Sequence, residues 1–409
     1  MNGKVRFAVL GAGGRGAFMA KLYGEHPDVE LLAMSDPNPK TFESEKNRTD
    51  IKNYISVRKY VNSLEMFEKE KGKIDWVLVA SPDFTHHEMI IAALKNGYNV
   101  FTEKPMCLSI KDADDICRIA AETGKQVVVG CELRFAAPVV KFKEILSSGA
   151  IGKILHGYCV DSVSRGFTYF LRYYRWKKYS LGLLMQKGVH SIDLINFFVD
   201  AEPVRVYADG GLDYFGQEKT KAGKYCRDCS EKDICEYSAV KRDVVLREKG
   251  ELCQDHCVFG SDTDVEDNDI LIINYSNGVR LSYNEINFAP EYKREFHFVG
   301  TEGRASLVMD QTPELKEQRA SNANLSGKAV SITVVKRNHP PEDIALDMPV
   351  GGGGHWGGDE RMRDELIKAI LSGKKIKPDE CDGRMSTAIV FAANESMEKQ
   401  MPVLIEKGR

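Results

Sequence analysis

The feature that most constrains this chain is a glycine-rich turn near its N-terminus. Lys4–Leu10 reads as a strand buried on both faces, and Gly11-Ala-Gly13-Gly-Arg-Gly16 follows it directly. Ala17–Tyr23 can then form a helix. In such a unit the first glycine permits the tight turn, the second admits a pyrophosphate, and the third lets the helix pack closely on the strand. The pattern predicts a dinucleotide site at the N-terminus of this helix.

An acidic residue stands where such a site needs one. Val29–Met34 reads as the next strand and ends at Ser35-Asp36, twenty positions after Gly16. A carboxylate there binds the ribose 2′-hydroxyl and repels a 2′-phosphate, so we expect NAD rather than NADP. The residues expected around this part of the cofactor are Gly11, Gly13, Gly14, Arg15, Gly16 and Asp36.

Length and composition indicate an ordinary globular protein of two domains, because 409 residues exceed one small core. The chain is 43% hydrophobic and 29% charged, and its formal net charge of −3 gives no reason to expect nucleic acid or an anionic membrane as partner. No signal-peptide pattern precedes the first strand, and no apolar run approaches the roughly 20 residues of a spanning helix. We expect a cytoplasmic protein.

Strands and helices alternate over the first 130 residues, which predicts a parallel sheet with right-handed crossovers. Asp75–Ala80 is another apolar strand and leads into Ser81-Pro-Asp-Phe-Thr-His86. Asn99–Thr102 leads into Glu103-Lys104-Pro105. Because ligands of open α/β sheets bind at the carboxyl ends of the strands, Lys104 is expected beside the cofactor.

These motifs together resemble the Gfo/Idh/MocA oxidoreductases, the family of glucose–fructose oxidoreductase and inositol dehydrogenase. The resemblance covers most of the chain, and it is specific to the family rather than to one substrate. The matching motifs are Gly11-x-Gly13-x-x-Gly16, Asp36, Ser81-Pro82-x-x-x-His86, Glu103-Lys104-Pro105, Arg134-Phe135 and Ser147–Gly152.

The resemblance implies an α/β fold in two domains. A doubly wound, parallel Rossmann sheet is expected over residues 1–130, and an α/β domain with a large, mainly antiparallel sheet over 131–409. It also implies that Ser81, Pro82, His86 and Glu103 lie at the cofactor. Lys104 is expected to reach the reacting centre beside the nicotinamide.

Strand patterns continue in the second domain, and Asn277-Gly278 predicts a hairpin between two of them. Lys316–Lys328 reads as a surface loop and Gly351–Gly354 as a flexible run. The predicted strands are Ile154–Val163, Val204–Gly210, Ile270–Tyr275, Val279–Tyr283, Arg294–Val299 and Arg304–Met309, and the predicted helices are Glu360–Leu371 and Ser386–Met397.

Polar residues open another predicted helix at Gln186-Lys187-Gly-Val-His190-Ser-Ile-Asp193. Spacings of three and four can place all four polar side chains on one face. In the family this segment faces the nicotinamide and its histidine transfers a proton. Many relatives have aspartate four residues before the histidine, whereas Gln186 cannot act as a base. We expect His190 to take a hydroxyl proton, Lys104 and Lys187 to hold the substrate oxygen, and Asp193 to orient His190.

Aromatic and cationic residues gather in Tyr169–Lys178, just before that helix. They predict either a sugar-binding face that includes Arg175 and Trp176, or a loop packed on the core. Arg134 and Gln186 are also expected at the substrate. His355 and Asp359 are interpreted as a loop residue and a helix cap, with a place over the active site as the alternative.

Five of the ten cysteines lie between positions 226 and 257. In a reducing compartment a Cys-x-x-Cys pair with further thiols nearby indicates a metal site rather than disulfides. We expect Cys226, Cys229, Cys235 and Cys257 to hold a structural zinc ion that staples an insertion over 211–267, which has few apolar residues to bury. Cys253 and His256 are the competing fourth ligands, and an iron–sulfur cluster is the competing metal centre.

The leading functional hypothesis is an NAD-dependent oxidoreductase that oxidises a secondary alcohol of a sugar, sugar derivative or glycoside. The alternative is a redox-neutral, NAD-dependent glycosidase that works by transient C3 oxidation, elimination and water addition. A non-enzymatic NAD-sensing protein is a third hypothesis, which the presence of both Lys104 and His190 disfavours. The expected partners are a small-molecule sugar or glycoside and further copies of the chain, in a homodimer or homotetramer.

Overall fold

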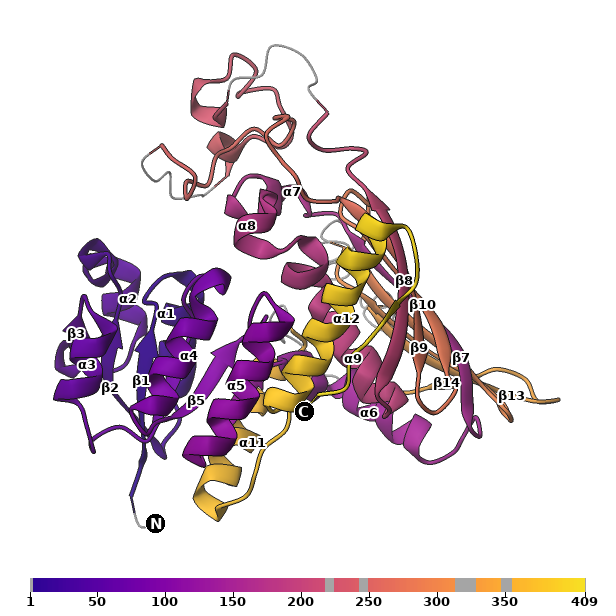
Figure 1. Ribbon diagram of the computed structural model, residues 1–409, viewed down its shortest axis with the longest axis horizontal. Helices are drawn as coiled ribbons and strands as arrows, with labels where there is room; N and C mark the ends of the chain where they lie inside the picture. The colour runs from indigo at the N-terminus through magenta and orange to yellow at the C-terminus, as the bar shows by residue number, and fades with distance from the viewer. Residues whose placement is uncertain (1–2, 218–223, 243–248, 313–328, 347–354, 409) are drawn as a thin grey trace. The chain divides into compact units, whose positions relative to one another are not determined.

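The computed structural model describes residues 3–217, 224–242, 249–312, 329–346 and 355–408 (Figure 1). The chain divides into two compact units. The first comprises residues 1–137, 355–387 and 408–409, and the second comprises 138–354 and 388–407. The sequence assigns 355–387 to the second domain, but the structure places it in the first unit. The reason is α11 (Gly358–Ser372), whose Met362, Leu366 and Ile367 belong to the core of that unit.

The first unit contains a parallel sheet of six strands, counted over the described residues. Its strand order, β3-β2-β1-β4-β5-β6, confirms the predicted doubly wound Rossmann fold. The strands are β1 (Val5–Leu10), β2 (Val29–Ser35), β3 (Arg58–Tyr60), β4 (Trp76–Val79), β5 (Asn99–Glu103) and β6 (Val127–Gly130).

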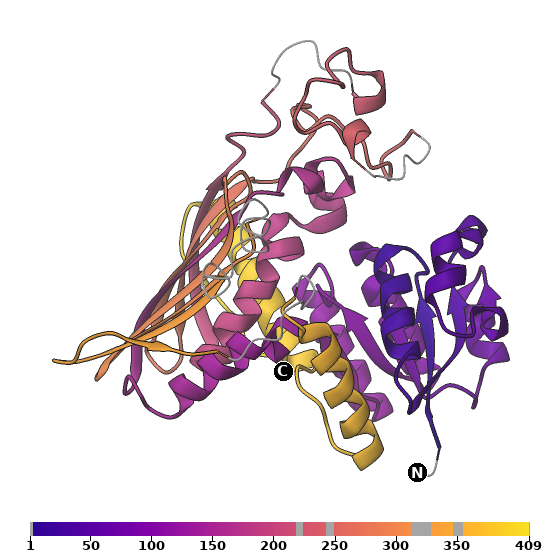
Figure 2. The same ribbon diagram turned by 180° about the vertical axis from the view of Figure 1, so that it is seen from behind.

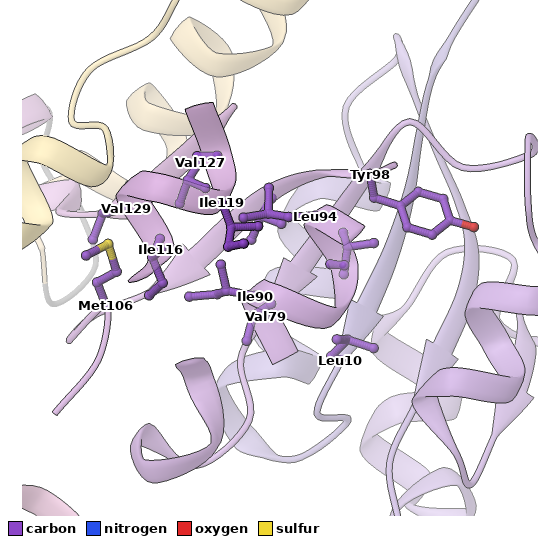
Figure 3. Packing of buried hydrophobic residues seen from close by; sticks show 14 of the residues in the cluster. Leu10, Val79, Ile90, Leu94, Tyr98, Met106, Ile116, Ile119, Val127 and Val129 are labelled. Carbon is purple, nitrogen blue, oxygen red and sulfur yellow. The ribbon is translucent and has the colours of Figure 1, made fainter. Parts of the chain in front are cut away.

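Helices cover both faces of this sheet. Successive residues of each strand point to opposite faces, so each strand contributes side chains to two apolar clusters. Figure 3 shows one face, where α4 (His86–Lys95) and α5 (Ile110–Thr123) pack against the strands. Val79 and Val129 lie in that cluster, whereas Leu78 and Val128 belong to the cluster on the other face, with α1 (Gly14–Gly24) and α11. Strands buried on both faces explain the continuous apolar runs in the sequence.

The second unit contains a nine-stranded sheet in the described part of the chain, with the order β14-β13-β12-β11-β7-β10-β9-β8-β15. All neighbouring pairs are antiparallel except β7 with β10, and the predicted hairpin at Asn277-Gly278 joins β9 to β10. The strands are β7 (Ile154–Val163), β8 (Pro203–Gly211), β9 (Asn268–Tyr275), β10 (Arg280–Ile286), β11 (Tyr292–Gly300), β12 (Gly303–Asp310), β13 (Val330–Lys336), β14 (Glu342–Ile344) and β15 (Val403–Leu404).

Helices cover one face of this sheet (Figures 1 and 2). Phe142 of α6 (Ala137–Ser147) and Phe198 of α9 (Val189–Val199) pack against Phe298 of β11. Ser396 of α12 (Glu380–Lys399) accepts a hydrogen bond from the backbone of β8. The opposite face exposes apolar side chains in this chain, among them Tyr158, Tyr207, Ile270 and Ile272.

Two predicted helices begin earlier than the sequence indicates, and the first of them, α11, starts at Gly358 instead of Glu360. Helix α12 starts at Glu380 instead of Ser386, because Asp379 accepts hydrogen bonds from the backbone amides of Cys381 and Asp382 and so caps a polar first turn.

The predicted loop at Lys316–Lys328 and the run Gly351–Gly354 lie outside the described residues. Over the described ranges, none of the helices has the length and apolar character needed to cross a membrane.

Candidate cofactor and substrate sites

The glycines of the turn after β1 fall into two pairs, one tightly packed and one beside open space. A Cβ on Gly11, whose φ is +90°, would lie 2.6 Å from the carbonyl oxygen of Ala80, and a Cβ on Gly16 would lie 1.7 Å from that of Gly11. At Gly13 and Gly14 a Cβ would meet no atom within 4 Å. The first pair therefore permits the turn and its packing, and the second pair leaves open space beside backbone amides at the start of α1, as a bound pyrophosphate requires.

Asp36 is held rigidly at the carboxyl end of β2. Its Oδ2 accepts a hydrogen bond from the backbone N–H of Ala12 at 2.9 Å, and its Oδ1 accepts one from the N–H of Asn38 at 2.9 Å. These bonds fix the carboxylate beside the glycine-rich turn. An acid in this position suits an NAD ribose.

Arg15 binds two carboxylates of the protein. Its Nε donates to Glu103 Oε1 at 2.8 Å, and its Nη2 donates to Asp359 Oδ1 at 2.7 Å. Asp359 also bonds to His355 Nδ1 at 2.7 Å, and His355 Nε2 lies 3.2 Å from Glu132 Oε1. The guanidinium expected at the cofactor thus belongs to an ion-pair network of the first unit.

This network gives His355, which lies in a turn as predicted, and Asp359 a shared ion-pair role, whereas the predicted cap is not Asp359. Gly357 is the N-cap of α11, and Asp359 lies in its first turn. Burial would lower the pKa of His355, but the carboxylates of Glu132 and Asp359 raise it overall. Burial raises the pKa of Glu103 despite the opposing charge of Arg15. The sequence could not reveal this network, because Arg15 and Asp359 are 344 positions apart.

His86 joins the two loops that follow β4 and β5. Its Nδ1 lies 2.7 Å from the carbonyl oxygen of Pro105, and its Nε2 lies 2.9 Å from that of Ser81. The imidazole is buried, and both of its nitrogens contact backbone carbonyl oxygens. Half-buried Lys104 directly precedes the Pro105 carbonyl that His86 holds. His86 is therefore a positioning residue for the Glu103-Lys104-Pro105 segment.

Arg134, expected at the substrate, is buried and paired within the first unit. Its Nη1 and Nη2 each lie 3.3 Å from Asp382 Oδ1, at the start of α12. Burial raises the pKa of Asp382. The charges of Arg134 and Lys377 and a backbone hydrogen bond from Asp379 together outweigh this effect, so that the pKa is lowered overall.

The polar helix of the second unit is not uniformly α-helical. Leu184–Gly188 is a π-helical turn that carries Gln186 and Lys187, and α9 begins at Val189 with His190 and Asp193. A π-helical turn has more residues per turn than an α-helix, so side chains three or four positions apart no longer lie on one face. The predicted single α-helical face therefore does not extend across Gly188. All four polar side chains are nevertheless buried in the unit. Short π-helical turns occur often at functional sites.

Lys187 lies in a buried charge cluster that the sequence analysis missed. Its Nζ is 3.7 Å from Asp161 Oδ2, and Arg294 Nε is 3.5 Å from Asp161 Oδ1. The Tyr283 hydroxyl is within hydrogen-bond distance of both Asp161 Oδ2, at 3.0 Å, and Glu285 Oε2, at 3.1 Å. Asp161 pairs in register with Glu285 on β10 and with Arg294 on β11. The sequence does contain one signal for this cluster. Side chains alternate between the two faces of a strand, and Asp161, Glu285 and Arg294 occupy the positions of their strands that point inward.

Burial raises the pKa of Glu285 to about 7, against the opposing charge of Lys187. The folded protein therefore holds this proton more tightly than the unfolded chain does, and ionisation of Glu285 costs stability as the pH rises from about 5 to about 8. Replacing Glu285 by glutamine removes this effect. We expect the unfolding free energy of the wild type, relative to Glu285→Gln, to fall by about 2 to 3 kcal/mol across that range in urea titrations. A difference that stays constant with pH would contradict this assignment.

Arg175 and Trp176 contact the cysteine-rich insertion. The Arg175 side chain is 1% exposed and donates to the carbonyl oxygens of Cys257 and Gly260, so it is not available to a substrate. Trp176 Nε1 donates to the carbonyl oxygen of Asp262 at 2.5 Å. Of the two expected roles of this segment, the structure therefore supports the loop packed on the core.

Four cysteines surround one small cavity in the insertion. Two backbone bonds, from Cys226 N–H to Asp255 O and from Cys257 N–H to Lys224 O, join two distant stretches of chain. The cavity has a volume of about 20 Å³, and its lining includes Cys226, Cys229, Cys235 and Cys257 together with Lys232. Cys253 does not line it, and its Sγ lies 3.3 Å from His256 Nε2.

The insertion has a larger apolar core than the sequence suggests. Phe215 and Val258 of the insertion pack with Phe167, Phe170 and Leu183 in one buried cluster. Half-buried aromatic rings extend this cluster, among them Tyr214, Tyr237 and Phe259. The expectation that the insertion buries few apolar residues is thus wrong, because its aromatic residues share a core with residues 167–183.

Two family models match the chain. Residues 5–131 match "Oxidoreductase family, NAD-binding Rossmann fold", and residues 139–306 match "GFO/IDH/MocA C-terminal domain". The protein therefore belongs to the Gfo/Idh/MocA oxidoreductase family, whose N-terminal domain binds NAD.

Individual relatives agree with this family. The Bacillus subtilis protein YteT is 28% identical over 327 residues, which cover 72% of each chain. The 2,7-anhydro-N-acetylneuraminate hydratase of Mediterraneibacter gnavus is 28% identical over 209 residues, 51% of this chain and 52% of that one. Inositol dehydrogenases are further relatives. The structure of levoglucosan dehydrogenase with NADH and levoglucosan has the same fold, with a TM-score of 0.73, 18% identity and coverage of 99% and 100% of the two chains.

Proposed function

We propose that this protein is an NAD-dependent oxidoreductase that oxidises a secondary alcohol of a sugar, sugar derivative or glycoside. The observation that carries the proposal is the glycine-rich turn, where open space at Gly13 and Gly14 adjoins the fixed carboxylate of Asp36 in a chain of this family. Inositol and levoglucosan dehydrogenases among its relatives support a polyol or sugar substrate.

The proposed roles follow from the chemistry of alcohol oxidation. The glycine-rich turn and Asp36 would hold NAD, whose nicotinamide would supply the hydride acceptor for the carbinol carbon. His190 takes the hydroxyl proton, and Asp193, three residues later on α9, orients the imidazole. Lys104 and Lys187 bind the substrate oxygen and stabilise its developing negative charge. Asp161, 3.7 Å from the ammonium of Lys187, holds that side chain in place.

Gln186 is retained as a proposed substrate contact, since it shares the π-helical turn with Lys187. Ser81, Pro82 and Glu103 are retained as proposed neighbours of the cofactor, because they follow β4 or end β5 at the carboxyl edge of the sheet.

The alternative function is a redox-neutral, NAD-dependent glycosidase. In that reaction transient oxidation at C3 acidifies the C2 proton, the glycosidic oxygen leaves, water adds and the ketone is reduced again. The anhydroneuraminate hydratases among the relatives favour this alternative, because their name also denotes addition of water to a sugar.

One assay separates the two functions. Cofactor released from the purified protein is identified by mass spectrometry, and the protein is incubated with myo-inositol, levoglucosan and a set of 4-nitrophenyl glycosides. NADH formed in proportion to added NAD, without nitrophenol, is the expected result. Nitrophenol without net NADH would establish the glycosidase, and neither product from any compound would count against both functions.

Asp36 is proposed to select NAD over NADP. Replacing Asp36 by alanine removes the carboxylate that binds the ribose hydroxyls and repels a 2′-phosphate. We expect the preference for NADH over NADPH, measured as the ratio of dissociation constants by fluorescence titration, to fall about 10-fold or more. Asp50→Ala, at the C-terminal end of the short helix Glu45–Asp50, is the matched control and should leave the ratio unchanged. An unchanged ratio in Asp36→Ala would exclude this role.

We also propose a structural zinc ion held by Cys226, Cys229, Cys235 and Cys257. The donor types fit, because four thiolates make a closed tetrahedral site and a cavity of about 20 Å³ lies among these residues. Zinc binding would draw the sulfur atoms together, since no three of them lie within 4.8 Å of one another in the described part of the chain. Cys257 is favoured over Cys253 and His256, which do not line the cavity. An iron–sulfur cluster, the competing centre, would show visible absorption that zinc lacks.

Assembly and location are also proposed. We propose a homodimer or homotetramer, because apolar side chains such as Ile270, 54% exposed, lie on the uncovered face of the nine-stranded sheet. A cytoplasmic location suits the ten cysteines, all of which lie in the described residues without a disulfide.

A further inference from the structure

Arg175 connects the cysteine cavity with the segment that precedes the π-helical turn. Its Nη1 donates to the carbonyl oxygens of Cys257 at 2.7 Å and Phe170 at 3.0 Å. Its Nη2 donates to Gly260 O at 2.9 Å and to Asp262 Oδ1 at 2.6 Å. A planar, buried guanidinium with four such bonds has one geometry, so the backbone at Cys257 fixes Arg175.

The residues next to Arg175 are bound to the same stretch of the insertion. The Arg175 carbonyl oxygen accepts a hydrogen bond from Thr263 Oγ1 at 2.7 Å, and the Lys177 N–H donates to Asp264 Oδ1 at 2.7 Å. Lys177 Nζ also donates to Glu266 Oε1 at 2.5 Å. Residues 175–177 therefore take their position from residues 257–266 of the insertion.

A shared apolar cluster continues this connection to the π-helical turn. Val258, directly after Cys257, belongs to the same buried cluster as Leu183. Leu183 is the N-cap residue of Leu184–Gly188, the turn that carries Gln186 and Lys187. A shift at Cys257 would therefore reach the backbone of this turn through the packed side chains of that cluster, since packed cores resist continuous deformation.

Two cationic side chains lie near the cavity. Zn²⁺ with four thiolates carries a net double negative charge. Lys232 lines the cavity, and Arg175 binds the carbonyl of the ligand residue Cys257. Lys232 and Arg175 would offset part of this charge, with Arg175 also paired to Asp262 at 2.6 Å, and outer contacts of this kind tune metal sites.

We infer that a metal ion at Cys226, Cys229, Cys235 and Cys257 positions the turn Leu184–Gly188 through Arg175 and Leu183, so that substrate turnover depends on a metal that does not touch the substrate. This inference rests on the proposed zinc site and on the proposed oxidoreductase function. Arg175 is a positioning residue in it.

The test begins with metal content and amide exchange in the full-length protein. Mass spectrometry should find about one zinc per chain in the wild type and in Cys253→Ser, the matched cysteine outside the cavity, and should find it lost in Cys229→Ser and Cys235→Ser. Hydrogen exchange over residues 183–188 should accelerate about 10-fold or more in the zinc-free variants. Arg175→Lys should keep its zinc yet show the same acceleration, because lysine cannot make the four guanidinium bonds.

Kinetics supply a second readout. In the zinc-free variants kcat/KM for whichever panel compound is oxidised should fall about 10-fold to 100-fold. The NADH dissociation constant should stay within about twofold, since the cofactor site lies in the first unit. Unchanged exchange at 183–188 and unchanged kcat/KM after zinc loss would overturn the inference, and so would a wild type without metal.

The proposed function and this inference can fail separately. A wild type that binds NADH but oxidises none of the panel compounds would disprove the function as proposed. The exchange rates of residues 183–188 would still decide whether the metal positions the turn.

Discussion

Replacing Gly16 by alanine is expected to disrupt the fold of the first unit, whereas Gly13→Ala is expected to leave the fold intact and weaken only the binding of the cofactor. At Gly16 the new Cβ would lie 1.7 Å from the carbonyl oxygen of Gly11, a backbone atom that cannot move aside. Overpacking of this kind costs about 3 kcal/mol or more, a large part of typical domain stability. At Gly13 the Cβ enters open space that the pyrophosphate is proposed to use. Thermal unfolding and NADH titration distinguish the two results.

For Gly13→Ala we expect an unchanged midpoint of unfolding and an NADH dissociation constant raised about 10-fold to 100-fold, or about 1.4 to 2.7 kcal/mol. Gly24→Ala, at the other end of α1, is the matched control, because a Cβ there also meets no atom within 4 Å. It should leave both quantities unchanged or raise stability slightly. NADH binding by Gly13→Ala at the wild-type strength would refute the proposed phosphate site.

The sequence predicts the cofactor half of this protein well because its determinants are local. Gly11, Gly16 and Asp36 are set by one strand–turn–helix–strand unit, and each lies where that unit requires it. The predicted carboxyl-edge position of Glu103 is likewise a property of one strand. Short-range steric and hydrogen-bonding rules suffice for such residues.

Polar networks between distant segments could not be predicted in the same way. Asp161, Glu285 and Arg294 meet only because three strands pair in a particular register. Arg15, expected at the cofactor from its place in the glycine motif, also pairs with Asp359, which lies far along the chain. Arg175 is predicted to lie either on a sugar-binding face or in a loop packed on the core, and its burial against the insertion favours the loop. In each case the sequence does not reveal the long-range partner of the charged side chain.

His190 is the residue whose loss is expected to reduce turnover most. Without a base for the hydroxyl proton, His190→Asn should lower kcat about 10²-fold to 10⁴-fold for the panel compound that the wild type oxidises. The NADH dissociation constant should change by less than about twofold. His339→Asn, an exposed histidine in the turn after β13, is the control and should keep wild-type kcat. A kcat for His190→Asn close to that of the wild type would remove His190 from the mechanism.

A double variant then tests whether Asp193 acts only through His190. Asp193→Asn alone should lower kcat, because the imidazole loses the carboxylate proposed to orient it. In a chain that already carries His190→Asn, the same change should have no further effect, since residues that act as one unit are not additive. Independent, multiplying losses would instead mean that Asp193 serves the substrate or the fold directly. Unfolding midpoints of the four proteins in this cycle separate those two outcomes, because a structural role lowers the midpoint whichever residue occupies position 190.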